Sequence, residues 1–139
     1  MHRSAYLAAH ALLIAVSCGG AADDAYGVGL RFADAEALRQ TDTIIVSYYV
    51  SDGRDDQCSR LRAARPRLRA DLGPFRQVLD DTARNNGTSL ERSDIPVGVW
   101  AVLVDATTAD GTQVGEGCAQ AQVVTEGKKT SIAIVIDAP

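Results

Sequence analysis

Histidine and methionine are almost absent from this sequence of 139 residues, and those present lie near its start. The histidines are His2 and His10, and Met1 is the only methionine. If a leader covering these positions is removed, the remaining chain cannot form a Ser-His-Asp triad, a Cys-His nucleophile or an HExxH zinc site. The commonest hydrolase and metalloprotease chemistries are therefore excluded for that remaining chain.

Lysine is equally scarce, because the only lysines are the adjacent Lys128 and Lys129. A Ser-Lys dyad would need one of them, yet both lie in an expected turn, where a solvated ammonium makes a poor general base. The carboxylate pairs Asp55-Asp56 and Asp80-Asp81 also fit a glycosidase poorly, since adjacent residues on a strand point to opposite faces. We therefore predict that the chain is not an enzyme and that it holds no cofactor and no metal ion.

The chain also lacks an excess of positive charge and, beyond its first residues, a long apolar run. Its 14 basic residues face 18 acidic ones, for a formal net charge of −4 at pH 7. Nucleic-acid binding needs a basic surface that releases counterions, so we predict no nucleic-acid partner. No later apolar stretch approaches the about 18 residues of a membrane span. The length predicts one domain.

The first residues have the pattern of an export signal. Arg3 precedes an apolar run from Tyr6 to Val16, which ends in Ala15-Val16-Ser17-Cys18. A charged start, an apolar stretch too short to span a bilayer and a small-residue cleavage site predict a signal peptide. Residues 14–18 resemble the lipobox of bacterial lipoproteins, although Ala15 stands where leucine is usual. The resemblance implies cleavage before Cys18, whose sulfur would carry diacylglycerol.

This resemblance also implies a location. Two or three acyl chains anchor a protein stably, whereas one alone binds only marginally. Gly19 in place of aspartate after the cysteine favours the outer membrane of a Gram-negative bacterium. We divide the chain into a signal peptide at 1–17, a lipidated tether at 18–25 and a folded domain at 26–139. The alternative is an ordinary secretory signal cut near Ala21 or Ala22, which would discard Cys18.

If Cys18 is the anchor, the chain has two other cysteines, Cys58 and Cys118. In an oxidising envelope two cysteines of a small domain are read most simply as a disulfide. A metal site would need at least two more good ligands. The bridge would close a loop of about 60 residues, which the chain-entropy model values at roughly 4 kcal/mol. The alternative is a pair of buried free thiols.

Apolar and polar residues alternate with a period of two along much of the chain, which predicts β-strands. The predicted strands are 28–32, 43–50, 97–105, 112–124 and 130–137, with shorter ones at 75–79 and 89–92. The run 97–105 is apolar on both faces, as in a central strand. About seven strands predict an all-β fold, a single antiparallel β-sandwich of the transthyretin or immunoglobulin type.

The connections between these strands predict how they pair and where they are interrupted. The last three strands are joined by short turns, so we expect them to be consecutive and antiparallel. Cys118 is out of phase with Ala119 on its strand, and a bulge at Gly115 or Gly117 would turn it inward toward Cys58. After Cys58 we expect a short helical or irregular segment over 57–64, which Pro66 ends.

The C-terminal part of the chain has a recognisable order of turn residues. It reads Asp94-Ile95-Pro96-Val97-Gly98-Val99-Trp100, Ala109-Asp110-Gly111, Gly117-Cys118 and Gly127-Lys128. This order resembles prealbumin-like or carboxypeptidase-regulatory-like domains of bacterial surface lipoproteins. The resemblance covers 94–136 and implies a small transthyretin-like sandwich with a binding or scaffolding role. It transfers no catalytic residues.

Five arginines crowd the segment between Cys58 and Leu72, and they form a candidate patch for anionic ligands. They are Arg60, Arg62, Arg65, Arg67 and Arg69. Guanidinium groups bind phosphates through paired hydrogen bonds, so lipid head groups or lipopolysaccharide are candidate ligands. The simpler interpretation, which we favour, is a solvated loop whose charge is neutralised by nearby carboxylates. These carboxylates would be Asp52, Asp55, Asp56 and Asp71.

Tyr48, Tyr49 and Trp100 are candidates for a sugar-stacking platform, but alternation places the two tyrosines on opposite faces and predicts Trp100 in the core. We therefore predict a non-catalytic, lipid-anchored binding or structural module of the cell envelope. The alternative is a carbohydrate- or peptidoglycan-binding module that uses Tyr48 or Tyr49, and an enzyme ranks third. The sequence does not identify the partner, which is an envelope protein or a glycan.

Overall fold

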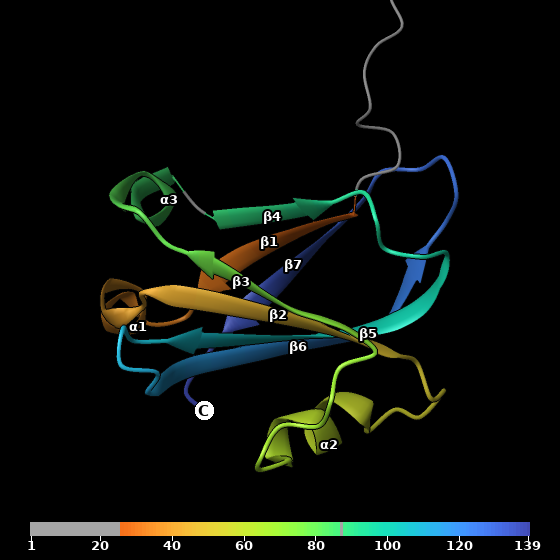
Figure 1. Ribbon diagram of the computed structural model, residues 1–139, viewed down its shortest axis with the longest axis horizontal. Helices are drawn as coiled ribbons and strands as arrows, with labels where there is room; N and C mark the ends of the chain where they lie inside the picture. Colours follow the sequence, from red (N-terminus) through yellow and green to blue (C-terminus); the bar gives the residue numbers. More distant parts are fainter. Residues whose placement is uncertain (1–25, 87) are drawn as a thin grey trace, which may run out of the picture.

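A computed structural model describes residues 26–86 and 88–139, and within them the chain forms seven strands and three short helices (Figure 1). In chain order these are β1 (Tyr26–Phe32), α1 (Ala35–Gln40), β2 (Thr43–Val50), α2 (Gln57–Ala63), β3 (Leu72–Val78), α3 (Asp81–Asn86), β4 (Thr88–Arg92), β5 (Gly98–Thr107), β6 (Gln113–Val124) and β7 (Thr130–Ile136). The strands form two sheets, ordered β4-β1-β7 and β3-β2-β5-β6. The predicted all-β sandwich is confirmed. No helix in this part of the chain is long and apolar enough to cross a membrane.

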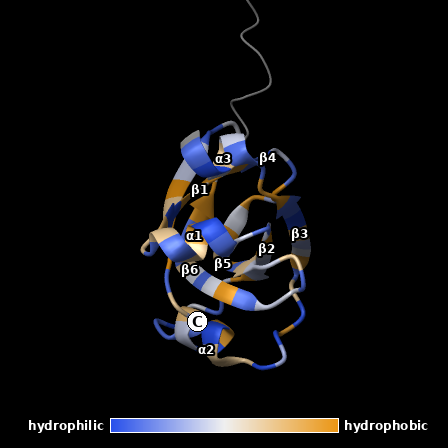
Figure 2. Ribbon diagram, turned by 90° about the vertical axis from the view of Figure 1, so that its left-hand side faces the viewer, coloured by the Kyte–Doolittle hydropathy of each residue, from blue (hydrophilic) through white to orange (hydrophobic). Residues whose placement is uncertain are grey.

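The two sheets enclose one apolar core, which the period-two alternation of the strands creates. Alternate residues of β5, among them Trp100, Val102 and Val104, point into it, and Val28 of β1 and Ile134 of β7 face them from the other sheet. Figure 2 shows the apolar residues concentrated on the strands, whereas α3 at the end of the sandwich is mostly hydrophilic. Trp100 belongs to this core, as predicted, and is only 8% exposed.

The last strand, β7, does not continue the sheet of β5 and β6, so the expectation of three consecutive antiparallel strands is wrong. It pairs in parallel with β1, and its backbone link to β6 is an isolated bridge between Glu116 and Asp137, the residue after β7. Two glycines of β6 leave room for this arrangement. A Cβ on Gly115 would lie 2.5 Å from Ile136 Cγ2, and one on Gly117 would lie 2.6 Å from Ile134 Cγ2. The side chains of β7 therefore fill the space that these glycines leave, and the two sheets meet closely at this edge.

Two register shifts interrupt the pairing of β6 with β5, and one of them adjoins Gly115, where a bulge was expected. The first lies between Trp100 and Val102, and the second, between Ala106 and Thr107, leaves Val114 as the extra residue of β6 directly before Gly115. The first shift leaves Gln120 and Ala121 opposite one residue, and Ala121 has a φ of 55°. Cys118 pairs with Leu103 and, like it, faces the outer side of the sheet, where α2 lies, rather than the core between the sheets.

The helix α2 confirms the helical segment expected after Cys58, whereas α1 and α3 were not predicted. Asp34 begins α1, because its side chain accepts a hydrogen bond of 3.0 Å from the backbone N–H of Glu36. Both helices are six residues long, and neither contains a run of apolar residues that periodicity could detect. They lie at the same end of the sandwich (Figure 1).

Candidate functional site

The outer face of the four-stranded sheet carries α2, and the predicted disulfide holds it there. The bond between Cys58 and Cys118 is present, with the two Cα atoms 5.7 Å apart. Gln120, two residues along β6, accepts a hydrogen bond of 2.8 Å from the Cys58 N–H and donates one of 2.7 Å to the Asp55 carbonyl. The start of α2 is thus fixed to β6 by one covalent bond and two hydrogen bonds.

A second, smaller core lies beneath α2. Leu61 of the helix packs against Tyr49 of β2 and against Ala101 and Leu103 of β5. Tyr48 lies on the opposite face and belongs to the main core, so the two tyrosines are separated as predicted. Their exposed fractions are 1% for Tyr48 and 6% for Tyr49. These buried rings do not form a sugar-stacking platform with Trp100, and that alternative use of the aromatic residues is wrong.

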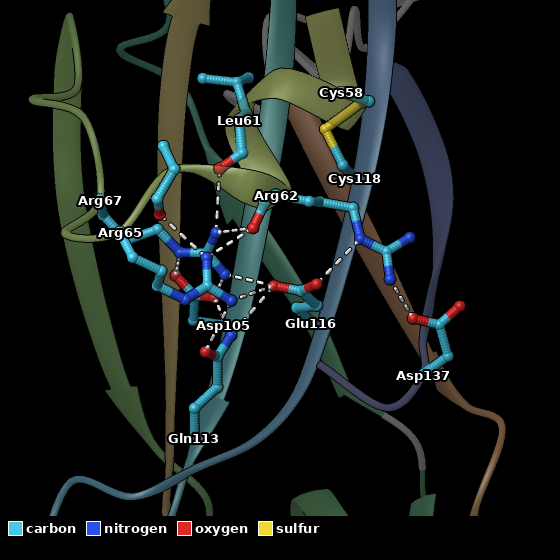
Figure 3. Close-up of polar contacts among 11 residues, drawn as sticks. Cys58, Leu61, Arg62, Arg65, Arg67, Asp105, Gln113, Glu116, Cys118 and Asp137 are labelled. Carbon is cyan, nitrogen blue, oxygen red and sulfur yellow. Dashed lines mark hydrogen bonds and ion pairs between the residues drawn. A yellow bond between two sulfur atoms is a disulfide. The ribbon is translucent and has the colours of Figure 1, made fainter. Parts of the chain in front are cut away.

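Charged residues gather where the end of α2 meets the sheet, and Arg67 is at their centre (Figure 3). Its guanidinium donates two hydrogen bonds to Asp105 of β5, of 2.6 and 3.2 Å, and pairs also with Glu116 of β6. The same side chain donates to the carbonyls of Leu61 and Arg62, at 2.9 and 2.8 Å. A helix leaves its last carbonyls without partners, so Arg67 satisfies this end of α2 while pairing with the sheet.

Two further arginines complete what we call the α2 network. Arg62 bridges Glu116 at 3.1 Å and Asp137, just after β7, at 2.6 Å. Arg65 lies 3.3 Å from Glu116, and Gln113 donates a hydrogen bond of 2.7 Å to Asp105. The members of the network are Arg62, Arg65, Arg67, Asp105, Gln113, Glu116 and Asp137. They come from α2, the segment after it, β5, β6 and the residue after β7, so the network ties the helix to both sheets.

The favoured interpretation of the arginine segment, a loop neutralised by neighbouring aspartates, is correct only for Arg60. That side chain pairs with Asp52 and Asp56 and is well exposed. Asp71 instead accepts a hydrogen bond of 2.7 Å from the Val50 N–H. The carboxylates that neutralise the other arginines come from β5, β6 and the end of β7, because α2 packs on those strands. Arg69 forms no ion pair with another described residue.

Asp105, Gln113, Glu116 and Asp137 were not among the predicted site residues. A signal for two of them was present, since Asp105 ends the apolar run of β5 and Glu116 stands among the glycines of β6. Acidic side chains in the middle of a buried strand need a cation nearby, because an unpaired buried charge is strongly destabilising. The arginines of the 60–69 segment were the obvious candidates. The pattern did not show which arginine would reach which carboxylate.

The environment of Glu116 determines what this network can do chemically. Burial raises the pKa of its carboxyl, but the hydrogen bonds from Arg67 and Arg62 outweigh that effect and hold the pKa below the ordinary value of 4.5. A carboxylate kept ionised in this way is not poised to transfer a proton near neutral pH. Among residues 26–86 and 88–139, no group of three or more His, Cys, Asp or Glu side chains could hold a metal ion. The ion pairs of the network hold α2 against β5, β6 and the end of β7.

We expect Glu116→Gln to lower the free energy of unfolding by about 3 kcal/mol at neutral pH, because it removes the buried carboxylate that Arg62, Arg65 and Arg67 share. Because the folded pKa of Glu116 is depressed, its stabilising contribution is present above 4.5 and is lost as the pH falls through the folded value. Urea unfolding measured from neutral to acidic pH should therefore show a shallower acid decline in the variant.

The matched control for this experiment is Glu126→Gln. Glu126 is exposed in the turn between β6 and β7 and forms no ion pair with another described residue. We expect it to leave stability within about 0.5 kcal/mol of the wild type. Equal losses in the two variants would show that the α2 network contributes nothing beyond net charge.

The remaining predicted site residue, Cys18, and the tether that follows it lie outside the described residues. No protein-family model matches the chain, and no curated protein matches it in sequence. Among solved structures the chain is similar to a DUF4876 family protein from Bacteroides thetaiotaomicron VPI-5482, with a TM-score of 0.39 and 12% identity. The match covers 82% of this chain and 23% of that chain, so this chain spans about a quarter of its neighbour's length. A likeness this distant carries no argument about function.

Proposed function

We propose that the chain is a lipid-anchored protein of a bacterial cell envelope whose β-sandwich serves as a non-catalytic binding or structural module. The observation that carries this proposal is the disulfide between Cys58 and Cys118, because such bonds persist in exported proteins and are rare in reducing compartments. It agrees with the export pattern that ends at Cys18. A chain with both features works outside the cytosol.

The charged residues support a non-catalytic role. The buried carboxylates of the domain, Asp105 and Glu116, are both engaged by arginines. Both carboxylates accept hydrogen bonds from the arginines that hold α2 in place. Neither carboxylate is therefore available as a general acid or base for a ligand. The histidines of the sequence are confined to its first ten residues. The side chains of the domain therefore favour a role in recognition or scaffolding over a role in catalysis.

The proposed anchor at Cys18 implies which end of the sandwich lies nearer the membrane. Tyr26 at the start of β1 is paired with Arg92 at the end of β4 and with Thr130 at the start of β7. The segment from Cys18 therefore joins the sandwich at the end formed by loops 93–97 and 125–129. At about 3.5 Å per residue, a tether of this length holds that end within about 25 Å of the bilayer. The end with α1 and α3 then points away from the membrane.

We expect labelled fatty acid to be incorporated into the wild-type protein and to be lost from Cys18→Ser, together with membrane association. The thiol of Cys18 is the only acceptor for thioether-linked lipid that the lipobox resemblance provides. The measurement is metabolic labelling followed by membrane fractionation. A matched control is Cys58→Ala combined with Cys118→Ala, which removes the other two cysteines and should keep the label. Label that persists in Cys18→Ser would refute the lipid anchor.

A further inference from the structure

A groove of about 380 Å³ opens on the outer face of the four-stranded sheet, next to the α2 network. Its floor is made of the outward-facing residues of β2, namely Ile45, Ser47 and Tyr49. One wall is the segment 67–70, which follows α2, and the other is β3 from Gly73 to Arg76. We refer to it as the β3 groove.

The groove lies where β3 bulges away from β2. Val46 pairs with Phe75 and Tyr48 with Leu72, so Gly73 and Pro74 together oppose Ser47. Gly73 has a φ of 96°, and a Cβ there would lie 3.0 Å from the Val46 carbonyl oxygen, so the bulge requires glycine. Bulges redirect side chains at sheet edges and are common beside binding sites.

Three arginines line the groove, and only one of them is neutralised within it. Arg67 is paired with Asp105, the only carboxylate among the lining residues. Arg69 and Arg76 are exposed, and neither forms an ion pair with another described residue. The groove therefore holds two uncompensated positive charges in a chain whose formal net charge is −4. Such a local concentration of positive charge attracts anions.

The hydroxyl groups of the groove floor, those of Tyr49 and Ser47, are uncharged. Burial raises the pKa of Tyr49, so its hydroxyl stays protonated and donates a hydrogen bond of 3.0 Å to the Leu68 carbonyl. This bond fixes the wall that carries Arg69. Ser47 lies beneath the bulge and offers a neutral hydroxyl to a bound group. The floor thus adds no negative charge to the site.

We propose that the β3 groove binds the phosphate group of a phosphomonoester between Arg69 and Arg76. Two guanidinium groups match a dianion, and each can donate a pair of parallel hydrogen bonds to phosphate oxygens, whereas a carboxylate would be satisfied by one arginine. The volume lies near the lower end of ligand sites, which range over about 300–1,000 Å³. The site therefore suits a small phosphorylated compound or the exposed phosphate of a lipid head group. This proposal does not depend on the lipid anchor.

Calorimetric titration of the purified full chain with inorganic phosphate tests this site. We expect saturable binding that weakens about tenfold in Arg69→Gln and in Arg76→Gln, because each removes charge-assisted hydrogen bonds. The matched control is Arg31→Gln, an exposed arginine on β1 in the other sheet, which should bind phosphate as the wild type does. Circular dichroism should show all three variants folded, since none of these arginines forms an ion pair with another described residue.

Vesicles then distinguish the two sources of phosphate. The Cys18→Ser chain, which has no lipid of its own on that residue, is mixed with vesicles of phosphatidylcholine with or without phosphatidic acid. Binding that needs phosphatidic acid and is competed by inorganic phosphate assigns the site to lipid head groups, and phosphate binding without vesicle binding assigns it to soluble compounds. The proposal is overturned if phosphate does not bind, if Arg69→Gln and Arg76→Gln bind it as the wild type does, or if Arg31→Gln weakens binding equally.

Discussion

Trp100→Ala is expected to lower the free energy of unfolding by about 3 to 5 kcal/mol, the cost of deleting a buried aromatic side chain. Trp100 lies on β5, which is flanked by β2 and β6, and its ring packs edge-on against Tyr48 with the ring centres 6.4 Å apart. Its indole N–H donates a hydrogen bond of 2.9 Å to the Pro96 carbonyl. Alanine would lose both contacts and leave a cavity between the sheets.

Urea unfolding followed by circular dichroism measures this loss against the roughly 5 to 15 kcal/mol that stabilises a typical domain. The matched control is Val99→Ala, because Val99 is the preceding residue of β5, points outward and is 41% exposed. We expect that variant to lose no more than about 1 kcal/mol. A wild-type unfolding midpoint in Trp100→Ala would contradict the central place of this side chain. Since Trp100 is the only tryptophan, we expect the fluorescence of the wild type to be blue-shifted, which would report the same burial.

Removing the disulfide is expected to cost roughly 4 kcal/mol, and to lower the melting temperature by roughly 15 °C, in the double variant Cys58→Ala, Cys118→Ala. The bond joins residues that are 60 positions apart in the sequence, so its loss frees a long loop in the unfolded chain. The folded state should survive, because the α2 network and the hydrogen bonds of Gln120 still hold α2 on the sheet.

Thermal unfolding with and without reductant measures this effect. Reduction should lower the melting temperature of the wild type to that of the double variant and should leave the variant unchanged, which is the internal control. Both thiols of freshly exported wild-type protein should resist alkylation until reductant is added. Thiols that react before reduction, or a double variant that melts with the wild type, would show that the bond is not part of the native protein.

The positions of the strands and the burial of Trp100 were predictable from the sequence because both depend on local pattern. Period-two alternation decides which side chains of a strand share a face, whatever the strand packs against. It therefore separated Tyr48 from Tyr49 and aligned Trp100 with Val102. The pairing of Cys58 with Cys118 was predictable for a different reason, since assigning Cys18 to the anchor leaves one possible partner.

Only the tertiary structure decided which elements would meet. The placement of β7 beside β1 depends on the space left by Gly115 and Gly117, and this space exists only once the two sheets are packed together. Arg67 reaches Glu116 across 49 positions of sequence, and Arg76 joins the groove of Arg69 because β3 bulges beside the segment after α2. Ion pairs and grooves depend on distances in space, which local alternation does not encode. The sequence alone thus determined the strands and their buried faces, whereas packing of the sheets determined the partners of the arginines and the site that Arg69 and Arg76 form.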